Sequence, residues 1–327
     1  MQYPDDRFHN PRITSIRPSP RAKEFDCGFF TDRKGKRLFY REWGKKDVPD
    51  AMESAQTCII HCHGITSHSE MCIQVADGLV RERRVVFGLD FHGHGHSDGK
   101  RGDYTRFMDF IENLIDFKRF LEQKYPQKDY VLSGESMGAL VVALTVVMGQ
   151  MNKIEADLGN VKKLIFWAPA FAPNFEFGWG KEVGFGLKFA FNLFLKEESI
   201  NVPVDHSKTF KNSQALELHN TEPRVLKKYS ARYLWKVFQA MNKLKEYGFS
   251  QNIPIPFIII HGTSDKLVSQ PASRDFFEAS PIRTKCKYIK LHDVWHHLYS
   301  DSLFKQNVWE KVDTFLRNDR DLNPTHR

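Results

Sequence analysis

Six short apolar runs recur along this chain of 327 residues, and they constrain its fold more than any other feature. The runs are "TCIIHCHG" (57–64), "VVFGLD" (85–90), "YVLSGES" (130–136), "KLIFWAP" (163–169), "PFIIIHG" (256–262) and "KYIKL" (287–291). Their apolar residues are continuous rather than alternating, which is typical of strands buried on both faces of a parallel sheet. The sequence therefore predicts a sheet with helices on both sides.

Segments with a helical period lie between these runs. In residues 104–124 large apolar residues recur at spacings of three and four, namely Phe107, Phe110, Ile111, Leu114, Phe117 and Leu121. Before the first run, residues 24–44 predict an antiparallel hairpin around a turn at 32–35. The predicted fold class is α/β with a mostly parallel central sheet, and ligand sites in such sheets lie at the carboxyl ends of the strands.

One long stretch interrupts the alternation. Residues 168–252 contain no clear strand and are too long for a loop, so we predict a helical cap inserted between two parts of the core, 24–167 and 253–327. Residues 1–23 are polar and rich in proline, which predicts an irregular arm. The cap is unusually aromatic, through Phe175, Phe177, Trp179, Phe185, Phe189, Phe191 and Phe194. This segment could line an acyl-chain tunnel, enter a membrane interface or pack on the core.

Composition narrows the classes of partner. The net charge is +8, but the basic residues are scattered, so we expect no nucleic-acid partner. Lys181 and Lys188 favour peripheral contact of the cap with an anionic membrane surface. The five cysteines have no framework spacing and no apolar stretch reaches the ~18–20 residues that span a bilayer, so we expect a cytoplasmic protein with reduced thiols. The sequence leaves the oligomeric state open.

The stretch "YVLSGESMGALVVAL" carries the strongest chemical signal. An apolar run leads into Gly134-Glu135-Ser136-Met137-Gly138 and then directly into an apolar helix. G-x-S-x-G between a strand and a helix is the pattern of a nucleophile elbow, in which glycines allow a sharp turn that lifts the serine hydroxyl above the sheet. The amides at the helix N-terminus suit a developing oxyanion. The pattern therefore predicts Ser136 as a nucleophile.

A serine nucleophile needs a base that is oriented by a carboxylate, and in this arrangement the chain order is serine, acid, histidine. Asp265 follows the fifth run and is the predicted acid. Asp293 and Asp301 are rival acids, but neither follows a strand of its own. The loop after the last run offers three histidines, His292, His296 and His297. His292 lies too close to the strand end to reach over the site. The residues alone do not decide whether His296 or His297 is the base.

Two histidine-rich loops follow the first and second runs. In "HCHGITSHSE", Gly64 lets the backbone approach a substrate, so the amide of Ile65 can join that of Met137 as an oxyanion hole. In "FHGHGHSDG" three histidines alternate, but a metallohydrolase pattern H-x-H-x-D-H would need an aspartate after Gly95, where the chain has His96 and then Ser97. We therefore predict a tight glycine turn in this second loop, and no metal and no cofactor for the protein.

These motifs resemble those of the monoglyceride lipase and lysophospholipase family of α/β-hydrolases. The members of this family are serine aminopeptidase S33-like hydrolases. The resemblance covers residue 24 to the C-terminus and lies in "HGITSHS", "GHGHSDG", "GESMGA", "GTSDKLV" and "VWHHL". Matched position by position, it implies Ser136 as nucleophile, Asp265 as acid and His296 as base, with the amides of Ile65 and Met137 as the oxyanion hole.

The resemblance implies a serine esterase that cleaves a long-chain monoacyl lipid, either a monoacylglycerol or a lysophospholipid. Two other classes stay open. One is an α/β-hydrolase that acts on a soluble ester, a peptide or an acyl-transfer substrate. The other is a non-catalytic binding protein on the same fold, which the presence of Ser136, Asp265 and His296 disfavours.

Overall fold

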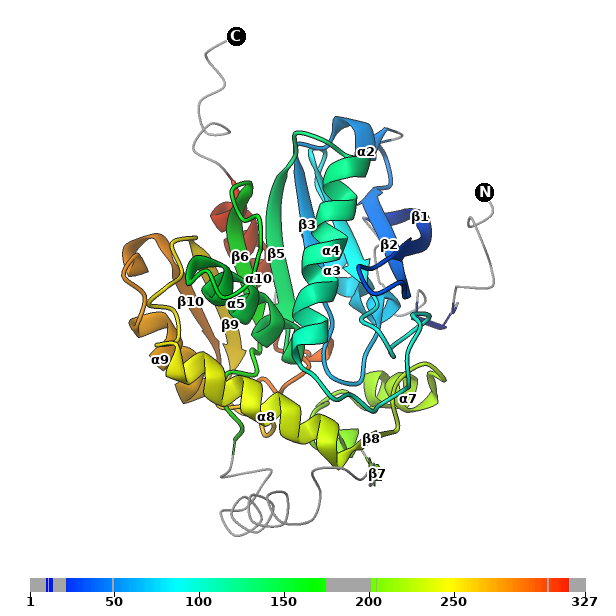
Figure 1. Ribbon diagram of the computed structural model, residues 1–327. Coiled ribbons are helices and arrows are strands. Elements are labelled where there is room, and N and C mark those ends of the chain that lie inside the picture. Colours follow the sequence, from blue (N-terminus) through cyan, green and yellow to red (C-terminus); the bar gives the residue numbers. More distant parts are fainter. Residues whose placement is uncertain are drawn as a thin grey trace.

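A central sheet carries the molecule, and its strands follow the predicted apolar runs (Figure 1). The computed structural model describes residues 10, 12–13, 22–48, 50–174, 201–203, 205–304 and 306–317. Within these residues the sheet has eight strands in the order β1-β2-β4-β3-β5-β6-β9-β10. They are β1 (Ala22–Thr31), β2 (Arg37–Lys45), β3 (Thr57–Cys62), β4 (Arg84–Leu89), β5 (Asp129–Glu135), β6 (Val161–Trp167), β9 (Phe257–Gly262) and β10 (Lys287–Leu291).

Strand directions confirm the predicted fold class. All neighbours from β4 to β10 are parallel, whereas β1 pairs antiparallel with β2 and β2 pairs antiparallel with β4. The predicted hairpin is also present, and its turn closes where the amide of Gly35 donates to the carbonyl of Asp32 over 2.9 Å. Gly35 has a φ of 77°, a conformation that glycine adopts without steric cost. The parallel strands place their carboxyl ends along one edge.

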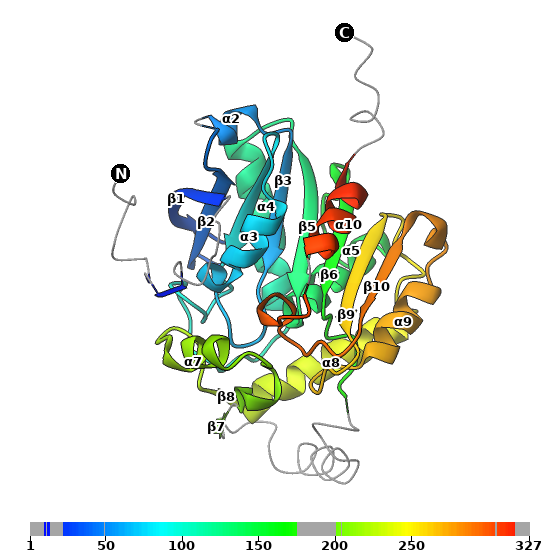
Figure 2. The same cartoon turned by 180° about the vertical axis from the view of Figure 1, so that it is seen from behind.

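Helices cover both faces of this sheet. The first face carries α4 (Met108–Lys124), α5 (Met137–Gln150) and α9 (Gln270–Glu278), together with α8 (Ala231–Glu246) of the inserted segment (Figure 1). The opposite face carries α3 (Ile73–Leu79) and α10 (Gln306–Leu316) (Figure 2). The short helices are α2 (Ala51–Ser54), α7 (Ser213–Thr221), η2 (Ser69–Cys72), η3 (His206–Lys208), η4 (Arg283–Lys285) and η5 (Leu298–Ser300).

Helix α5 is the most deeply buried helix of the first face. Every residue from Met137 to Met148 is buried, so the helix has no polar side. It packs on the sheet and against α4 and α8. A helix that is apolar around its whole circumference is stable only when it is covered on all sides. The neighbours of α5 therefore fix the position of its first turn, directly after the serine of the elbow.

The inserted segment, residues 168–252, is partly described, and one expectation for it was wrong. The sequence showed no clear strand there, but β7 (Asn201–Pro203) and β8 (Lys228–Ser230) pair antiparallel in a separate small sheet. Strands of three residues are too short to show a period in the sequence. The aromatic residues at 175–194 lie outside the described residues, so their predicted role is untested. The division into arm, core and cap also stays a prediction.

Helix α8 shows how the inserted segment attaches to the core. The Ser230 hydroxyl caps its first turn by accepting from the amide of Tyr233 over 3.1 Å. Its buried residues recur every three or four positions, at Tyr233, Leu234, Val237, Ala240, Met241 and Leu244. This stripe joins the same core cluster as α5. The helix thus lies across the sheet at the carboxyl ends of its strands (Figure 1).

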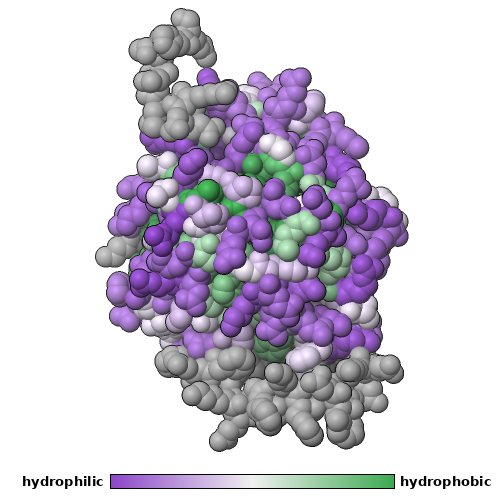
Figure 3. Space-filling view, turned by 60° about the vertical axis from the view of Figure 1, so that its left-hand side comes forward, coloured by the Kyte–Doolittle hydropathy of each residue, from purple (hydrophilic) through white to green (hydrophobic). Residues whose placement is uncertain are grey.

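The described residues expose few large hydrophobic side chains. Figure 3 shows one hydrophilic face on which hydrophobic residues lie in small groups. Among the described residues the large exposed hydrophobic side chains are Phe29 and Leu303. Within the same residues, no helix combines the length and the apolarity needed to cross a bilayer.

Because α5 packs closely on β3, a methyl group added at Gly138 should destabilise the fold. A Cβ at Gly138 would lie 2.1 Å from the carbonyl oxygen of Cys62, which is backbone and cannot move aside cheaply. Alanine in place of a helical glycine normally stabilises by about 0.5–1 kcal/mol, but overpacking costs about 1–3 kcal/mol. We expect Gly138→Ala to lower the free energy of unfolding by about 1–3 kcal/mol in denaturant titration.

Gly159→Ala is the matched control, because the nearest atom to its new Cβ would be Asp157 Oδ1 at 3.4 Å. The control should change the free energy of unfolding by less than about 0.5 kcal/mol. Stabilisation by Gly138→Ala would contradict the close approach of α5 to β3.

Candidate active site

Ser136 lies in a strained turn between β5 and α5. Its φ and ψ are 54° and −117°, far from the conformations that non-glycine residues prefer. Backbone hydrogen bonds hold the turn, since the amide of Ser136 donates to Trp167 O over 2.9 Å and the amide of Ala170 donates to Ser136 O over 3.1 Å. A Cβ at Gly134 would lie 2.4 Å from the carbonyl carbon of Gly138, so this turn requires glycine. The predicted elbow geometry is present.

Asp265 and His296 form a close buried pair. Nδ1 of His296 lies 2.7 Å from Oδ2 of Asp265, and each residue is 2% exposed. Oδ1 of the carboxylate accepts from the amides of Leu267 and Val268 over 2.8 and 3.0 Å. Burial acts to raise the pKa of Asp265, but the charge of His296 and hydrogen bonds from His261 and His296 outweigh it and hold that pKa well below its usual range. An ionised carboxylate can only accept hydrogen bonds, so Nδ1 of His296 must carry the proton that faces Asp265. Nε2 of His296 is then unprotonated and can act as a base.

His261 is a part of the site that sequence reasoning missed. It lies in β9, where its Nε2 is 3.1 Å from Asp265 Oδ2 and its Nδ1 is 2.8 Å from the hydroxyl of Ser273. The ring therefore connects α9 to the carboxylate and fixes the orientation of Asp265 from the side opposite the loop amides. A fully buried histidine inside an apolar strand was the available signal, because a buried polar ring needs partners.

Glu135 adds a second negative charge beside His296. Burial acts to raise the pKa of Glu135, but His297, His296 and His61 lower it below its usual value, which favours the ionised form. Burial lowers the pKa of His296, whereas the charge and hydrogen bond of Asp265 and the charge of Glu135 raise it, and the net pKa is above the usual histidine value. The site thus holds a basic imidazole that interacts with the charges of two carboxylates, Asp265 in contact and Glu135 nearby.

The two histidines left open by the sequence have different partners. His297 lies 3.2 Å from Glu135, measured from Nδ1 to Oε1, and its ring stacks on Phe210 with centroids 3.7 Å apart. The close contact to Asp265 belongs to His296. The rival acids are also separate, since Asp293 is exposed and Asp301 accepts from the amide of Trp295 within its own turn.

The segments that carry Ser136 and His296 are in contact, because their chain neighbours Glu135 and His297 lie 3.2 Å apart. Within the described residues, however, no hydrogen bond joins the side chains of Ser136 and His296 themselves. Hydrogen bonds between a nucleophile and its base are often long without a bound substrate and shorten in the reactive complex. The arrangement therefore suits a serine that gives its proton to His296 when a substrate is present.

The predicted oxyanion residues lie together beside Ser136. A Cβ at Gly64 would lie 3.5 Å from the Cβ of Ser136, which places the loop after β3 against the elbow. The hydroxyl of Tyr233 lies 3.5 Å from Ile65 O and 3.0 Å from Met137 Sδ, so a residue of the inserted segment contacts both. Met137 is the first residue of α5, and its amide has no partner within the helix.

The three alternating histidines of the second loop contact three different groups. His94 Nε2 lies 2.9 Å from the carbonyl of Ile65 and supports the loop beside the elbow. His92 contacts the side chain of Asn113, and His96 contacts Arg224. Burial lowers the pKa of each of the three rings, which favours their neutral forms. In the described parts of the chain no three His, Cys, Asp or Glu side chains are grouped as metal ligands.

Comparisons with known proteins agree with this geometry. The family model "Serine aminopeptidase, S33" matches residues 53–302. Monoglyceride lipase of Homo sapiens is 23% identical over 91% of this chain and 95% of its own length, and that of Rattus norvegicus is 23% identical over 94% and 95%.

Solved structures show the same fold. A soluble variant of monoglyceride lipase from Saccharomyces cerevisiae, in complex with a substrate analogue, superposes with a TM-score of 0.71 at 17% identity and covers 98% of this chain and 99% of its own. Monoacylglycerol lipase of Paleococcus ferrophilus has a TM-score of 0.66 at 19% identity, over 85% and 98%. Since the family match spans most of the chain, this protein belongs to the serine aminopeptidase S33 family of α/β-hydrolases, which confirms the resemblance of its motifs to monoglyceride lipases.

Proposed function

We propose that this protein is a serine esterase that hydrolyses the carboxylic ester of a long-chain monoacyl lipid. The observation that carries the proposal is the strained elbow of Ser136 together with the buried Asp265–His296 pair at 2.7 Å. A structural role alone gives no reason to hold an ionised carboxylate and a basic imidazole beside a strained serine. Strain and perturbed pKa values concentrate at catalytic sites because catalysis uses them.

In the first half of the reaction the hydroxyl oxygen of Ser136 attacks the ester carbonyl carbon, and Nε2 of His296 takes the hydroxyl proton. Asp265 stabilises the imidazolium that forms and keeps Nδ1 as the donor. The carbonyl oxygen becomes an oxyanion, which the amides of Ile65 and Met137 stabilise. His296 then gives its proton to the departing alcohol oxygen, and the acyl group stays on Ser136 as an ester.

In the second half water replaces the alcohol. His296 removes a proton from the water, whose oxygen attacks the acyl carbon, and the same oxyanion residues act again. The fatty acid leaves as Ser136 recovers its proton from His296. The residues complete this cycle without a metal or cofactor.

The substrate class is supported by relatives that align with this protein over nearly the whole of their own length. The monoglyceride lipases of rat and human align over 95% of their own chains. We extend their substrate class to this protein, with a monoacylglycerol preferred and a lysophospholipid as the alternative. Contact with a membrane through the aromatic residues of 175–194 is part of the same proposal.

Removal of the Ser136 hydroxyl tests the nucleophile. We expect Ser136→Ala to lower kcat on a monoacylglycerol by about 10⁴-fold or more, because no other group can form the acyl-enzyme. The variant should keep the thermal unfolding midpoint of the wild type, and a fluorophosphonate probe should label the wild type alone. Full esterase activity in the variant would contradict the proposed mechanism.

Asp265→Asn tests the acid. The amide keeps the shape of the carboxylate but favours the wrong imidazole tautomer, so we expect kcat to fall by about 10⁴-fold. Asp293→Asn is the matched control at the exposed rival position and should stay within about twofold of the wild type, as surface changes usually do. Equal losses in both variants would mean that Asp265 has no special role.

The pH profile tests the base. His296 must be neutral to accept a proton, and its pKa lies above the usual histidine value, so kcat/KM should rise with pH with a midpoint above about 6.5. Glu135→Gln removes a negative charge that favours the imidazolium, and the midpoint should therefore move to lower pH. The exposed Glu246→Gln serves as control and should leave the midpoint in place. A Glu135→Gln profile identical to that of the wild type would refute the charge effect.

A further inference from the structure

The predicted oxyanion hole needs two amides in the right place, those of Ile65 and Met137. Met137 begins α5, so the burial of that helix fixes its backbone. Ile65 lies in the turn after β3 and depends on side contacts to hold its position. A misplacement of about 1 Å in a catalytic group can cost about 10²-fold in rate. The contacts that hold this turn therefore bear directly on the reaction.

Groups of the core fix the direction of the Ile65 amide. The carbonyl of Gly64 accepts from the amide of Ser67 over 3.2 Å and lies 2.8 Å from Nδ1 of His63. Nε2 of His63 accepts from the amide of Phe91 over 3.1 Å, so Nδ1 carries the proton and donates to Gly64. In a trans peptide the carbonyl of one residue and the amide of the next point in opposite directions. The amide of Ile65 therefore points away from the donors to Gly64.

The inserted segment holds the same turn through two further contacts. The amide of Leu226 donates to the carbonyl of Thr66 over 2.9 Å, and the hydroxyl of Tyr233 lies 3.5 Å from the carbonyl of Ile65. The Tyr233 hydroxyl also lies 3.0 Å from Sδ of Met137. This one hydroxyl thus joins the turn that carries Ile65 to the first residue of α5.

The Tyr233 hydroxyl is a donor in this position. Its side chain is fully buried, and burial raises its pKa well above the usual value, with Tyr104 and Tyr229 as further causes. The hydroxyl therefore keeps its proton, and a carbonyl oxygen and a thioether sulphur can both accept it. The ring packs edge-on against Tyr104, with centroids 4.4 Å apart, which fixes where the hydroxyl lies.

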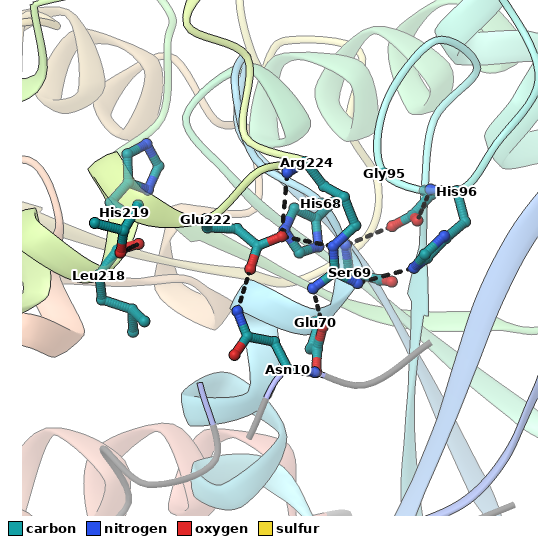
Figure 4. Close-up of polar contacts among 12 residues, drawn as sticks. Asn10, His68, Ser69, Glu70, Gly95, His96, Leu218, His219, Glu222 and Arg224 are labelled. Atoms are coloured by element: carbon teal, nitrogen blue, oxygen red, sulfur yellow. Dashed lines mark hydrogen bonds and ion pairs between the residues drawn. The ribbon is translucent and has the colours of Figure 1, made fainter. Parts of the chain in front are cut away.

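A group of buried charges anchors the inserted segment before Tyr233. Figure 4 shows Arg224 of this segment in contact with Glu222 beside it and with Glu70 of η2. Nη1 of Arg224 also lies 2.8 Å from Nε2 of His96. Both glutamates are fully buried, and hydrogen bonds to buried charged groups are among the stronger ones. The chain is therefore fixed to the core shortly before Leu226.

A second anchor lies directly before Tyr233, at the start of α8. Nη2 of Arg232 lies 2.7 Å from Oδ2 of Asp103, and the hydroxyl of Ser230 donates to Oδ1 of the same carboxylate over 2.6 Å. The amide of Ser230 donates to the carbonyl of Gly102, also over 2.6 Å. These contacts attach α8 to the loop of residues 102–103. The position of Tyr233 relative to the core follows from them.

We propose that Tyr233 is a positioning residue, which keeps Ile65 and Met137 at the spacing that lets both amides bind one oxyanion. The inference rests on the proposed esterase function and gives the inserted segment a part in the chemical step itself. Tyr233 acts through these two residues and not on the substrate. Because the oxyanion forms only in the transition state, loss of the Tyr233 hydroxyl lowers kcat and leaves KM in place.

Tyr233→Phe tests the inference, since it removes one oxygen and keeps the ring that packs on Tyr104. We expect kcat on monododecanoylglycerol to fall about 10-fold, less than the ~10²–10³-fold that loss of an oxyanion donor costs. KM should stay within about twofold of the wild type.

Tyr229→Phe is the matched control. It removes the same oxygen from another buried tyrosine of the inserted segment, whose hydroxyl makes no hydrogen bond to Ile65 or Met137 in the part of the chain that the structure describes. Both kinetic constants should match those of the wild type. Thermal unfolding shows that each variant is folded.

Two inhibitors separate positioning of the oxyanion hole from a merely structural role. A dodecyl trifluoromethyl ketone bonds its carbonyl carbon to the oxygen of Ser136, whose proton passes to His296, and its own oxygen becomes an oxyanion. The ether 1-O-dodecylglycerol has no carbonyl oxygen and reports binding of the chain and the alcohol alone. Tyr233→Phe should raise the inhibition constant of the ketone about 10-fold, in parallel with kcat, and leave that of the ether unchanged.

The outcomes distinguish this inference from the proposed function. An unchanged inhibition constant for the ketone in Tyr233→Phe, an equal rise for the ether, or an equal loss of kcat in Tyr229→Phe overturns the positioning role. Hydrolysis by the wild type still supports the esterase in each of these cases. If the wild type hydrolyses no ester and a fluorophosphonate does not label Ser136, both proposals fail.

Discussion

The close approach of α5 to the end of β3 is the constraint on which the site depends. Gly134 and Gly138 allow backbone to pass backbone where any side chain would collide, and Ser136 is held in its strained turn as a result. Strain of this kind costs of order 1–3 kcal/mol and persists only where the surroundings over-determine it. Here the surroundings are an apolar helix buried on every side and a sheet with matched parallel strands.

Electrostatics in the site follow from the same burial. Asp265 and His296 are removed from water and Glu135 is largely buried, so their mutual interactions decide which forms are charged. Asp265 stays ionised because two loop amides donate to its Oδ1 and two histidines, His261 and His296, both contact its Oδ2. The consequence is an imidazole whose tautomer and pKa are both set by its partners, which is the property a general base needs.

Contacts from distant parts of the chain complete the site. Tyr233 of the inserted segment reaches both predicted oxyanion residues, and His297 stacks on Phe210 of the same segment. Ile13, near the start of the sequence, is fully buried and packs against Ile73 of α3 and Leu218 of α7. The elbow is thus contacted by segments that are far from it in the sequence.

The sequence by itself determined the strand runs, the parallel sheet, the elbow and the position of Asp265 after its strand, because each depends on local patterns of apolar residues, glycine and chain order. The residues alone did not separate His296 from His297; the resemblance chose His296, and only the tertiary structure showed which ring reaches Asp265. The short strands β7 and β8 were missed because three residues show no period, and the support of Asp265 by His261 was missed because it depends on a contact inside the folded core. Contacts between residues far apart in the chain leave no local pattern, since they form only when packing brings separate elements together.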